Sequence, residues 1–146
     1  MPTAAKLVAA LAFAAVGWMA ADAFRPLMPD QTRWGVFLPV CAAVGVLCGW
    51  RVMGPRVGRG WGAALSSGLS TSAVLLAVAL AVFALREMIL RSMARRYDGV
   101  LEAVVAVFGI MLEYVALMGD VRFLAVLVVG GLLGGLAAEA ANRRWR

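Results

Sequence analysis

Apolar residues in this chain gather in long blocks, and charged residues fall almost entirely between the blocks. The apolar stretches run over about residues 7–24, 34–50, 63–85 and 122–141. A helix of roughly 20 apolar residues crosses the hydrocarbon core of a bilayer, which is about 30 Å thick. The pattern therefore predicts four transmembrane helices.

A fifth stretch, residues 100–118, is also long enough to span a membrane, but it carries Glu102 and Glu113. A carboxylate inside a span costs about 2 to 3 kcal/mol on insertion scales. This helix therefore either spans the membrane or lies at its interface. The predicted fold is an all-α integral membrane protein, a single domain over residues 1–146 formed by a bundle of four to five hydrophobic helices.

Composition excludes an ordinary soluble domain, because 64% of the residues are apolar and soluble domains have roughly half. The net charge of +6 would indicate nucleic acid as a partner of a soluble protein. Here the arginines sit in short loops and tails, as the positive-inside bias of membrane proteins predicts. We therefore expect a lipid bilayer as partner and no nucleic acid. We expect the chain to cross a membrane several times.

The orientation in the membrane depends on the fifth stretch, because Lys and Arg in short loops favour the cytoplasmic side. If all five stretches span, nine of these residues lie on one side and five on the other, which predicts a cytoplasmic C-terminus. If residues 100–118 do not span, each side holds seven, and the charges leave the orientation open.

Tryptophans frame most of the predicted spans. Trp34 and Trp50 bracket the second stretch, Trp61 precedes the third, and Trp145 follows the last. Indole rings prefer the headgroup level of a bilayer, so these positions favour span ends there. Trp18 departs from the pattern because it lies inside the first stretch.

The third helix is predicted to continue through Arg86 and Arg95 up to a turn signal at residues 98–99. An antiparallel hairpin would then place Arg95 beside Glu102 and Arg86 within a turn of Glu113. The two acids are eleven residues apart and share a helix face. An ionisable residue at membrane depth is a functional candidate, although paired acids can be purely structural. Both interpretations stay open for these four residues.

Two cysteines, Cys41 and Cys48, stand seven residues apart on the second stretch. In one helix they share a face but lie about 10 Å apart along the axis, which is too far for a disulfide. They are either inert small hydrophobes or thiols that meet a thiol-reactive oxyanion or a metal.

The loop over residues 51–60 has three arginines among three glycines. Arg56 and Arg59, together with backbone amides, could hold an oxyanion. A short loop that only sets the topology would have the same composition. No strand precedes the loop and no Lys-Ser/Thr pair ends it, so it is not a P-loop.

Small residues recur at a four-residue spacing, which allows two helix backbones to approach closely. The glycine pairs at this spacing are Gly45 with Gly49, Gly130 with Gly134, and Gly131 with Gly135. These faces pack either within the chain or against a partner, in a homo-oligomer or a larger membrane complex. The hydroxyl-rich segment 66–72 either binds a passing polar solute or bonds back to its own helix.

The chain has no histidine, which removes the usual ligand of zinc and haem and the usual proton relay. It also has no catalytic triad, no CxxC pair and no dinucleotide-binding glycine motif. We therefore predict a protein that is not an enzyme, with no catalytic residue, no cofactor and no metal site.

Several segments, spread over nearly the whole chain, are distinctive. They are MPTAAKLVAA (1–10), DAFRP (22–26), GWRVMGPRVGRG (49–60), RRYDG (95–99), MLEY (111–114) and the glycine-rich last stretch with its RRWR end (143–146). In these segments the chain resembles the TrgA family of small membrane proteins, associated with tellurite resistance in photosynthetic and related alphaproteobacteria. The resemblance implies an inner-membrane location and a link to tellurite tolerance. It implies no mechanism and no mapped site.

Three functions follow as hypotheses. The first is a membrane factor without enzymatic activity that raises tellurite tolerance through the thiols or the arginine loop. The second is a small oligomeric channel or carrier lined by Glu113 and residues 66–72. The third is an accessory or assembly subunit that docks on a larger membrane complex through its glycine faces.

Overall fold

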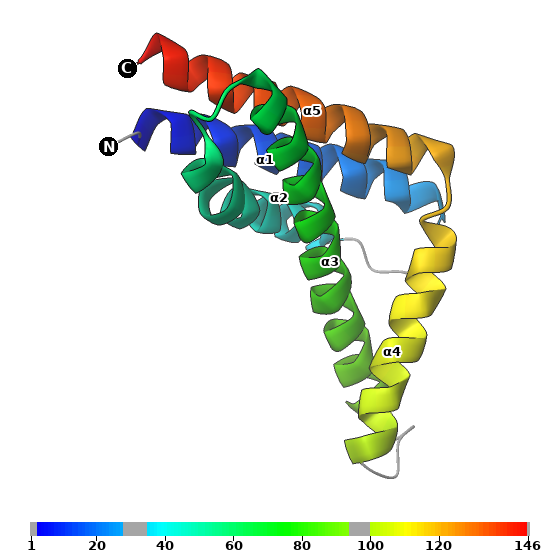
Figure 1. Cartoon of the computed structure of the whole chain (residues 1–146). Coiled ribbons are helices and arrows are strands. Elements are labelled where there is room, and N and C mark those ends of the chain that lie inside the picture. Colours follow the sequence, from blue (N-terminus) through cyan, green and yellow to red (C-terminus); the bar gives the residue numbers. More distant parts are fainter. Residues whose placement is uncertain (1–2, 28–34, 94–99, 146) are drawn as a thin grey trace.

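The computed structural model describes residues 3–27, 35–93 and 100–145, and these residues form helices joined by short turns (Figure 1). No strand occurs in these three ranges, which confirms the predicted all-α fold. In chain order the helices are α1 (Thr3–Phe24), the 3-10 turn η1 (Arg25–Leu27), α2 (Phe37–Cys48), the π turn η2 (Gly49–Met53), the 3-10 turn η3 (Gly54–Arg56), α3 (Trp61–Met93), α4 (Val100–Leu117) and α5 (Val121–Arg144).

Four helical segments of the described chain are long and apolar enough to cross a membrane, as predicted. They are Ala4–Phe24, Phe37–Arg56, Trp61–Leu90 and Val121–Arg144. The second extends past the predicted end at residue 50, because the helix winds on through η2 and η3. Met53 is fully buried there, so packing favours the extra turns although Arg51 lies within them.

The connection from α2 to α3 is short and depends on two glycines. Gly58 and Gly60 have φ angles of 93° and 100°, in the left-handed region that residues with a side chain rarely adopt. The carbonyl of Gly60 then accepts the amide of Ala64 at 2.9 Å, which starts α3. At the start of α5, the Asp120 carboxylate caps the helix by accepting the amide of Arg122 at 2.7 Å.

Helix α1 lies at the centre of the bundle, between α2 and α5, and α5 also packs against α3. A Cβ added to Gly45 would overlap the backbone of Phe13, and one added to Gly135 would overlap the carbonyl of Ala64. Gly130 and Gly134 face side chains of α1. The predicted glycine faces are therefore used for close packing between helices of this chain.

Neighbouring helices in the bundle run antiparallel, and this places both termini at one end. Phe24, at the end of α1, packs against Phe123, at the start of α5, with ring centroids 5.5 Å apart. At the other end, the amide of Gly58 meets Glu139 near the end of α5. The start of α1, the α2–α3 connection and the end of α5 thus lie together (Figure 1).

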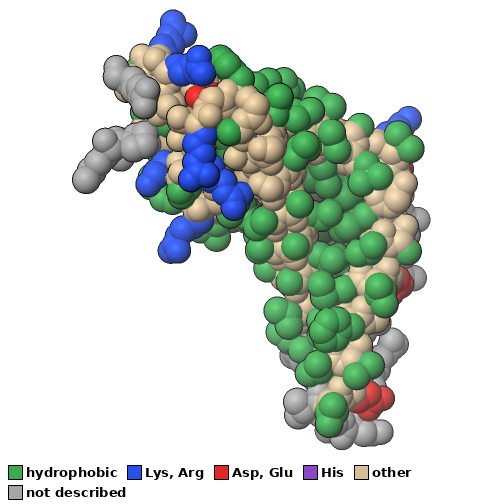
Figure 2. All heavy atoms as spheres, in the orientation of Figure 1, with side chains coloured by type: hydrophobic (Ala, Val, Ile, Leu, Met, Phe, Trp, Pro, Cys, Tyr) green, Lys and Arg blue, Asp and Glu red, His purple; other side chains and the backbone are tan. Residues whose placement is uncertain are grey.

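The second half of α3 leans away from the bundle, and α4 returns beside it to the start of α5 (Figure 1). We refer to residues 85–93 and 100–117 as the α3–α4 arm. Its exposed side chains are mostly large and apolar, including Leu101, Phe108 and Leu112 (Figure 2). Helix α3 has 33 residues and is therefore about 50 Å long, which exceeds the roughly 30 Å of a bilayer core.

Candidate functional site

Positive charge is concentrated where the two termini meet. We name this region the basic end, and its cations are Lys6, Arg51, Arg56, Arg59, Arg143 and Arg144 (Figure 2). The described residues of this end include these six cations and one acid, Glu139. The rest of the described chain has four arginines and five acids. The fold therefore separates the charge: the described excess lies at one end of the bundle.

Glu139 is the buried polar centre of this end. Its side chain is almost completely buried, with 2% of the residue exposed. One carboxylate oxygen, Oε2, accepts the amide of Gly58 at 2.6 Å, and the other, Oε1, lies 3.4 Å from Nε of Arg143. The carboxylate thus connects α5 to the α2–α3 connection and is neutralised by an arginine one turn further along.

The sequence interpretation missed Glu139. The residue stands alone among alanines near the end of an apolar span, in the segment LAAEAAN. An ionisable residue in such a setting is a functional or structural candidate by default. That isolation was the available signal, but its partner Gly58 lies 81 residues away in the sequence.

The six cations of the basic end differ in how firmly they are held. Nη1 of Arg56 donates to Oγ of Ser70 at 3.0 Å. The guanidinium of Arg143 lies 4.7 Å from the ring centroid of Trp61, within the range of a cation–π interaction. Arg51, Arg59 and Arg144 are exposed and make no hydrogen bond or ion pair with any described residue. These three are free to meet a group from outside the chain.

The α2–α3 connection does not form the oxyanion cradle that its composition suggested. Arg56 donates one hydrogen bond to Ser70, and the exposed Arg59 makes no hydrogen bond or ion pair with a described residue. The backbone amide of Gly58, which a cradle would use, is bound by Glu139. An anion would therefore meet an open arginine-rich surface at this point.

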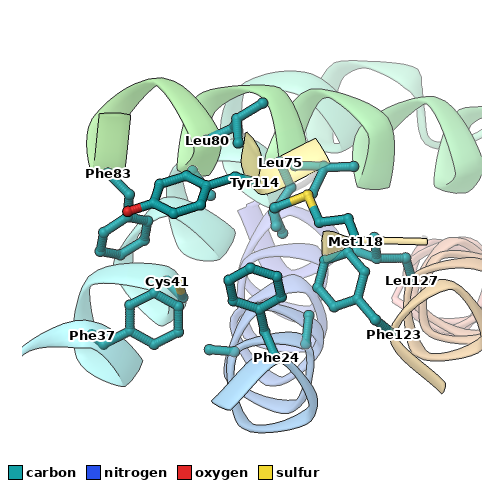
Figure 3. A pocket seen from close by; sticks show the side chains of 15 residues that line it. Phe24, Phe37, Cys41, Leu75, Leu80, Phe83, Tyr114, Met118, Phe123 and Leu127 are labelled. Atoms are coloured by element: carbon teal, nitrogen blue, oxygen red, sulfur yellow. The ribbon is translucent and has the colours of Figure 1, made fainter. Parts of the chain in front are cut away.

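Both cysteines are buried in α2 and reduced. Cys41 borders an apolar cavity of about 40 Å³ that is also lined by Phe24, Phe37, Phe83 and Phe123, whose rings point into a shared space (Figure 3). A small-molecule site usually needs roughly 300 to 1,000 Å³. The cavity is therefore a packing space between helices and is too small for a solute-binding site.

The acids of α4 are exposed, and one predicted pair is not formed. Arg86 and Glu113 are both exposed, and no ion pair joins them in the described chain. Glu102 is also exposed, while its predicted partner Arg95 lies outside the described residues. Among the described residues, no group of three or more His, Cys, Asp or Glu side chains could hold a metal ion.

The hydroxyls of segment 66–72 mostly bond back to their own helix. Ser66 donates to the carbonyl of Ala63 at 3.1 Å, and Thr71 donates to the carbonyl of Ser67 at 2.7 Å. Ser70 donates to the same carbonyl of Ser67 at 3.0 Å. Of the two interpretations open for this segment, these bonds favour the structural one over a solute path.

Comparison with known proteins adds no relative to this description. No family model matches the sequence, and no curated protein and no solved structure matches the chain. The resemblance to the TrgA family therefore stays a prediction, and the fold and the basic end are the established features of this membrane protein.

Proposed function

We propose that this chain is a multi-pass protein of a bacterial inner membrane that contributes to tellurite tolerance without enzymatic activity. The tellurite link comes from the resemblance to the TrgA family. The structural observation that supports it is the gathering of exposed arginines at the basic end. Tellurite is an oxyanion, and guanidinium groups bind oxyanions well because their donors match the oxygen geometry.

The same observation favours the arginines over the thiols as the groups involved. Cys41 and Cys48 lie in α2, and both are buried against apolar neighbours. Arg51 and Arg59 are exposed at the basic end and have no partner in the described chain. An anion arriving from water reaches the guanidinium groups first.

Replacing these arginines tests the proposal. Arg51→Gln with Arg59→Gln is expected to lower the minimal inhibitory tellurite concentration several-fold, because it removes two exposed cations and no internal bond. Cys41→Ala with Cys48→Ala should leave tolerance close to the parent value. The measurement is growth of a deletion strain that carries each variant, at matched amounts of protein in the membrane.

Two arginines at the other end of the bundle serve as the control. Arg25→Gln with Arg122→Gln removes the same charge where acids are abundant, and tolerance should be retained. Unchanged tolerance in the Arg51 and Arg59 variant, or an equal loss in the control, would contradict a role of the basic end.

We also propose that the chain crosses the membrane four times, through α1, the segment Phe37–Arg56, α3 and α5. The support is the antiparallel packing of these helices, with both termini at the basic end. A fifth crossing by α4 would put the C-terminus on the side opposite the N-terminus. In the four-crossing arrangement the α3–α4 arm lies against the far surface of the bilayer, because its exposed side chains are mainly apolar.

Reporter fusions distinguish the two arrangements. With four crossings, fusions after Arg59 and at the C-terminus should report the same side, and a fusion after Asp120 should report the opposite side. With five crossings, the C-terminal fusion would report the side opposite Arg59. The assay is paired alkaline phosphatase and fluorescent protein activity, and an insertion after Lys6 gives an internal reference for the basic end.

A further inference from the structure

The basic end carries a charge imbalance that its own residues do not neutralise. Glu139, the one acid among the described residues of this end, is buried and already bound by Gly58 and Arg143. At the opposite end, acids accompany the arginines, and Arg25 lies 3.5 Å from Asp22. The described residues therefore leave positive charge at the basic end that a group from outside the chain can neutralise.

Three tryptophans place the basic end at the level of lipid headgroups. They lie within or beside the segments that carry the cations of this end. Trp50 is 39% exposed, Trp61 is 46% exposed and Trp145 is 63% exposed. Indole rings favour the boundary between the acyl chains and water. The exposed arginines beside them then lie at the depth of the phosphodiester groups.

An apolar groove runs along the bundle toward the same end. It lies between α1 and α5, has a volume of about 510 Å³, and is lined mainly by small side chains such as Ala12, Ala15, Gly130 and Ala137. The groove covers thirteen residues of α5, from Ala125 to Ala137, so it is about 18 Å long. This is close to the roughly 15 Å thickness of one leaflet.

The groove is in register with one exposed cation, Arg144, on α5. Arg144 stands seven residues, or two helical turns, after Ala137, and so it lies above the groove on the same helix face. A molecule that fills the groove with an apolar chain would bring a head to Arg144. That combination of one apolar chain and one anionic head describes a phospholipid.

We propose that the basic end binds anionic phospholipids, with phosphodiester groups at Arg51, Arg59 and Arg144 and an acyl chain in the α1–α5 groove. Anionic lipids attract basic segments at the membrane surface. The cations project over the whole end and do not converge on one point (Figure 2). This distribution suits several headgroups in a plane better than one enclosed free anion. The proposal requires the membrane fold and does not depend on the link to tellurite.

Native mass spectrometry of the purified full chain tests the proposal. The protein is exchanged into detergent with equal amounts of phosphatidylglycerol and phosphatidylcholine, and the lipids retained on the chain are counted. Phosphatidylglycerol is expected to be retained preferentially, and each arginine should contribute about fivefold to its apparent affinity. The variant Arg51→Gln, Arg59→Gln, Arg144→Gln should lose the preference.

Two matched variants separate the charge from the groove. The variant Arg25→Gln, Arg86→Gln, Arg122→Gln removes the same charge elsewhere and should keep the preference. Ala15→Leu with Ala137→Leu fills the groove at positions whose side chains are exposed, and it should weaken retention while all cations remain. Circular dichroism and a single elution peak show that each variant is folded.

Three results would overturn the proposal. They are equal retention of the two lipids by the parent chain, an unchanged preference in the Arg51, Arg59 and Arg144 variant, and an equal loss in the control variant. Inorganic phosphate at millimolar concentration serves as a further probe. Phosphate can compete only for the arginines, so a lipid whose acyl chain fills the groove should stay bound, and its complete displacement would also overturn the proposal.

Discussion

Gly135→Ala is expected to separate α5 from α3 and to be among the most damaging single-methyl substitutions in this chain. A Cβ at this position would overlap the carbonyl oxygen of Ala64 and lie 3.1 Å from the Cα of Gly68. Both are backbone atoms, so no side-chain rotation can relieve the overlap and one helix must move. Overpacking of this kind costs about 1 to 3 kcal/mol, and more where the backbone cannot shift.

Gly68→Ala should have a comparable effect, because its Cβ would overlap the carbonyl oxygen of Gly131 on the same helix contact. The two substitutions affect one interface, so the double variant should lose less stability than the sum of the single losses. The measurement is the midpoint temperature of thermal unfolding in a mild detergent. Unfolding is monitored by circular dichroism or by the reaction of a thiol probe with Cys41, which is buried in the folded protein.

Gly109→Ala is the matched control for this prediction. Gly109 lies inside α4, and a Cβ there would have nothing within 4 Å. Alanine favours a helix over glycine by about 1 kcal/mol, so this variant should be neutral or slightly more stable. If Gly135→Ala and Gly109→Ala unfolded at the same temperature, the close contact of α3 with α5 would be wrong.

Glu139→Ala is expected to release the α2–α3 connection from α5. The substitution removes the acceptor of the Gly58 amide and the partner of Arg143. Hydrogen bonds to charged groups contribute about 1.5 to 3 kcal/mol, and the truncation also leaves a space in a buried position. The loss should fall mainly on the connection, because most of the bundle core lies elsewhere along α1, α2 and α5.

Trypsin provides a local readout for this release. Arg56 and Arg59 flank Gly58, so a freed connection should be cleaved several times faster than in the parent protein. Glu139→Gln retains an oxygen that can accept the amide of Gly58 and should give an intermediate rate. Glu113→Ala removes an exposed acid of α4 and should not change cleavage at these two arginines. Equal cleavage rates in the parent and Glu139→Ala would contradict the proposed role of this carboxylate.

The sequence predicted the helices well because the signal for them is local. A block of about 20 apolar residues has few alternatives in a bilayer, where every backbone amide and carbonyl must be bonded within its own helix. The glycine spacing of the last span likewise predicted close packing, since the absence of side chains on one helix face is visible without any partner. The structure adds which backbone packs against each face. The backbone of α3 at Ala64 and Gly68 packs against the glycine face of α5.

Interactions between distant segments were harder to predict. The pairing of Arg86 with Glu113 was inferred from an idealised hairpin, but both side chains are exposed and no ion pair joins them in the described chain. Glu139 was overlooked because its hydrogen-bond partner is a backbone amide, and a backbone amide leaves no trace in the composition of the sequence. The clusters that bury the two thiols include residues of α1 and α3 as well as of α2.

The sequence by itself determined that this is an all-helical membrane protein with four apolar spans, because hydrophobic length is a property of each segment alone. Only the tertiary structure decided that both termini and the α2–α3 connection lie together. The antiparallel packing of α1 with α5 brings Lys6 and Arg144 to one end, and the bond of Gly58 to Glu139 places Arg59 there too, although the sequence separates these cations by up to 138 positions. Cations that are scattered along the sequence thus form one surface, because the packing of the helices brings them to the same end.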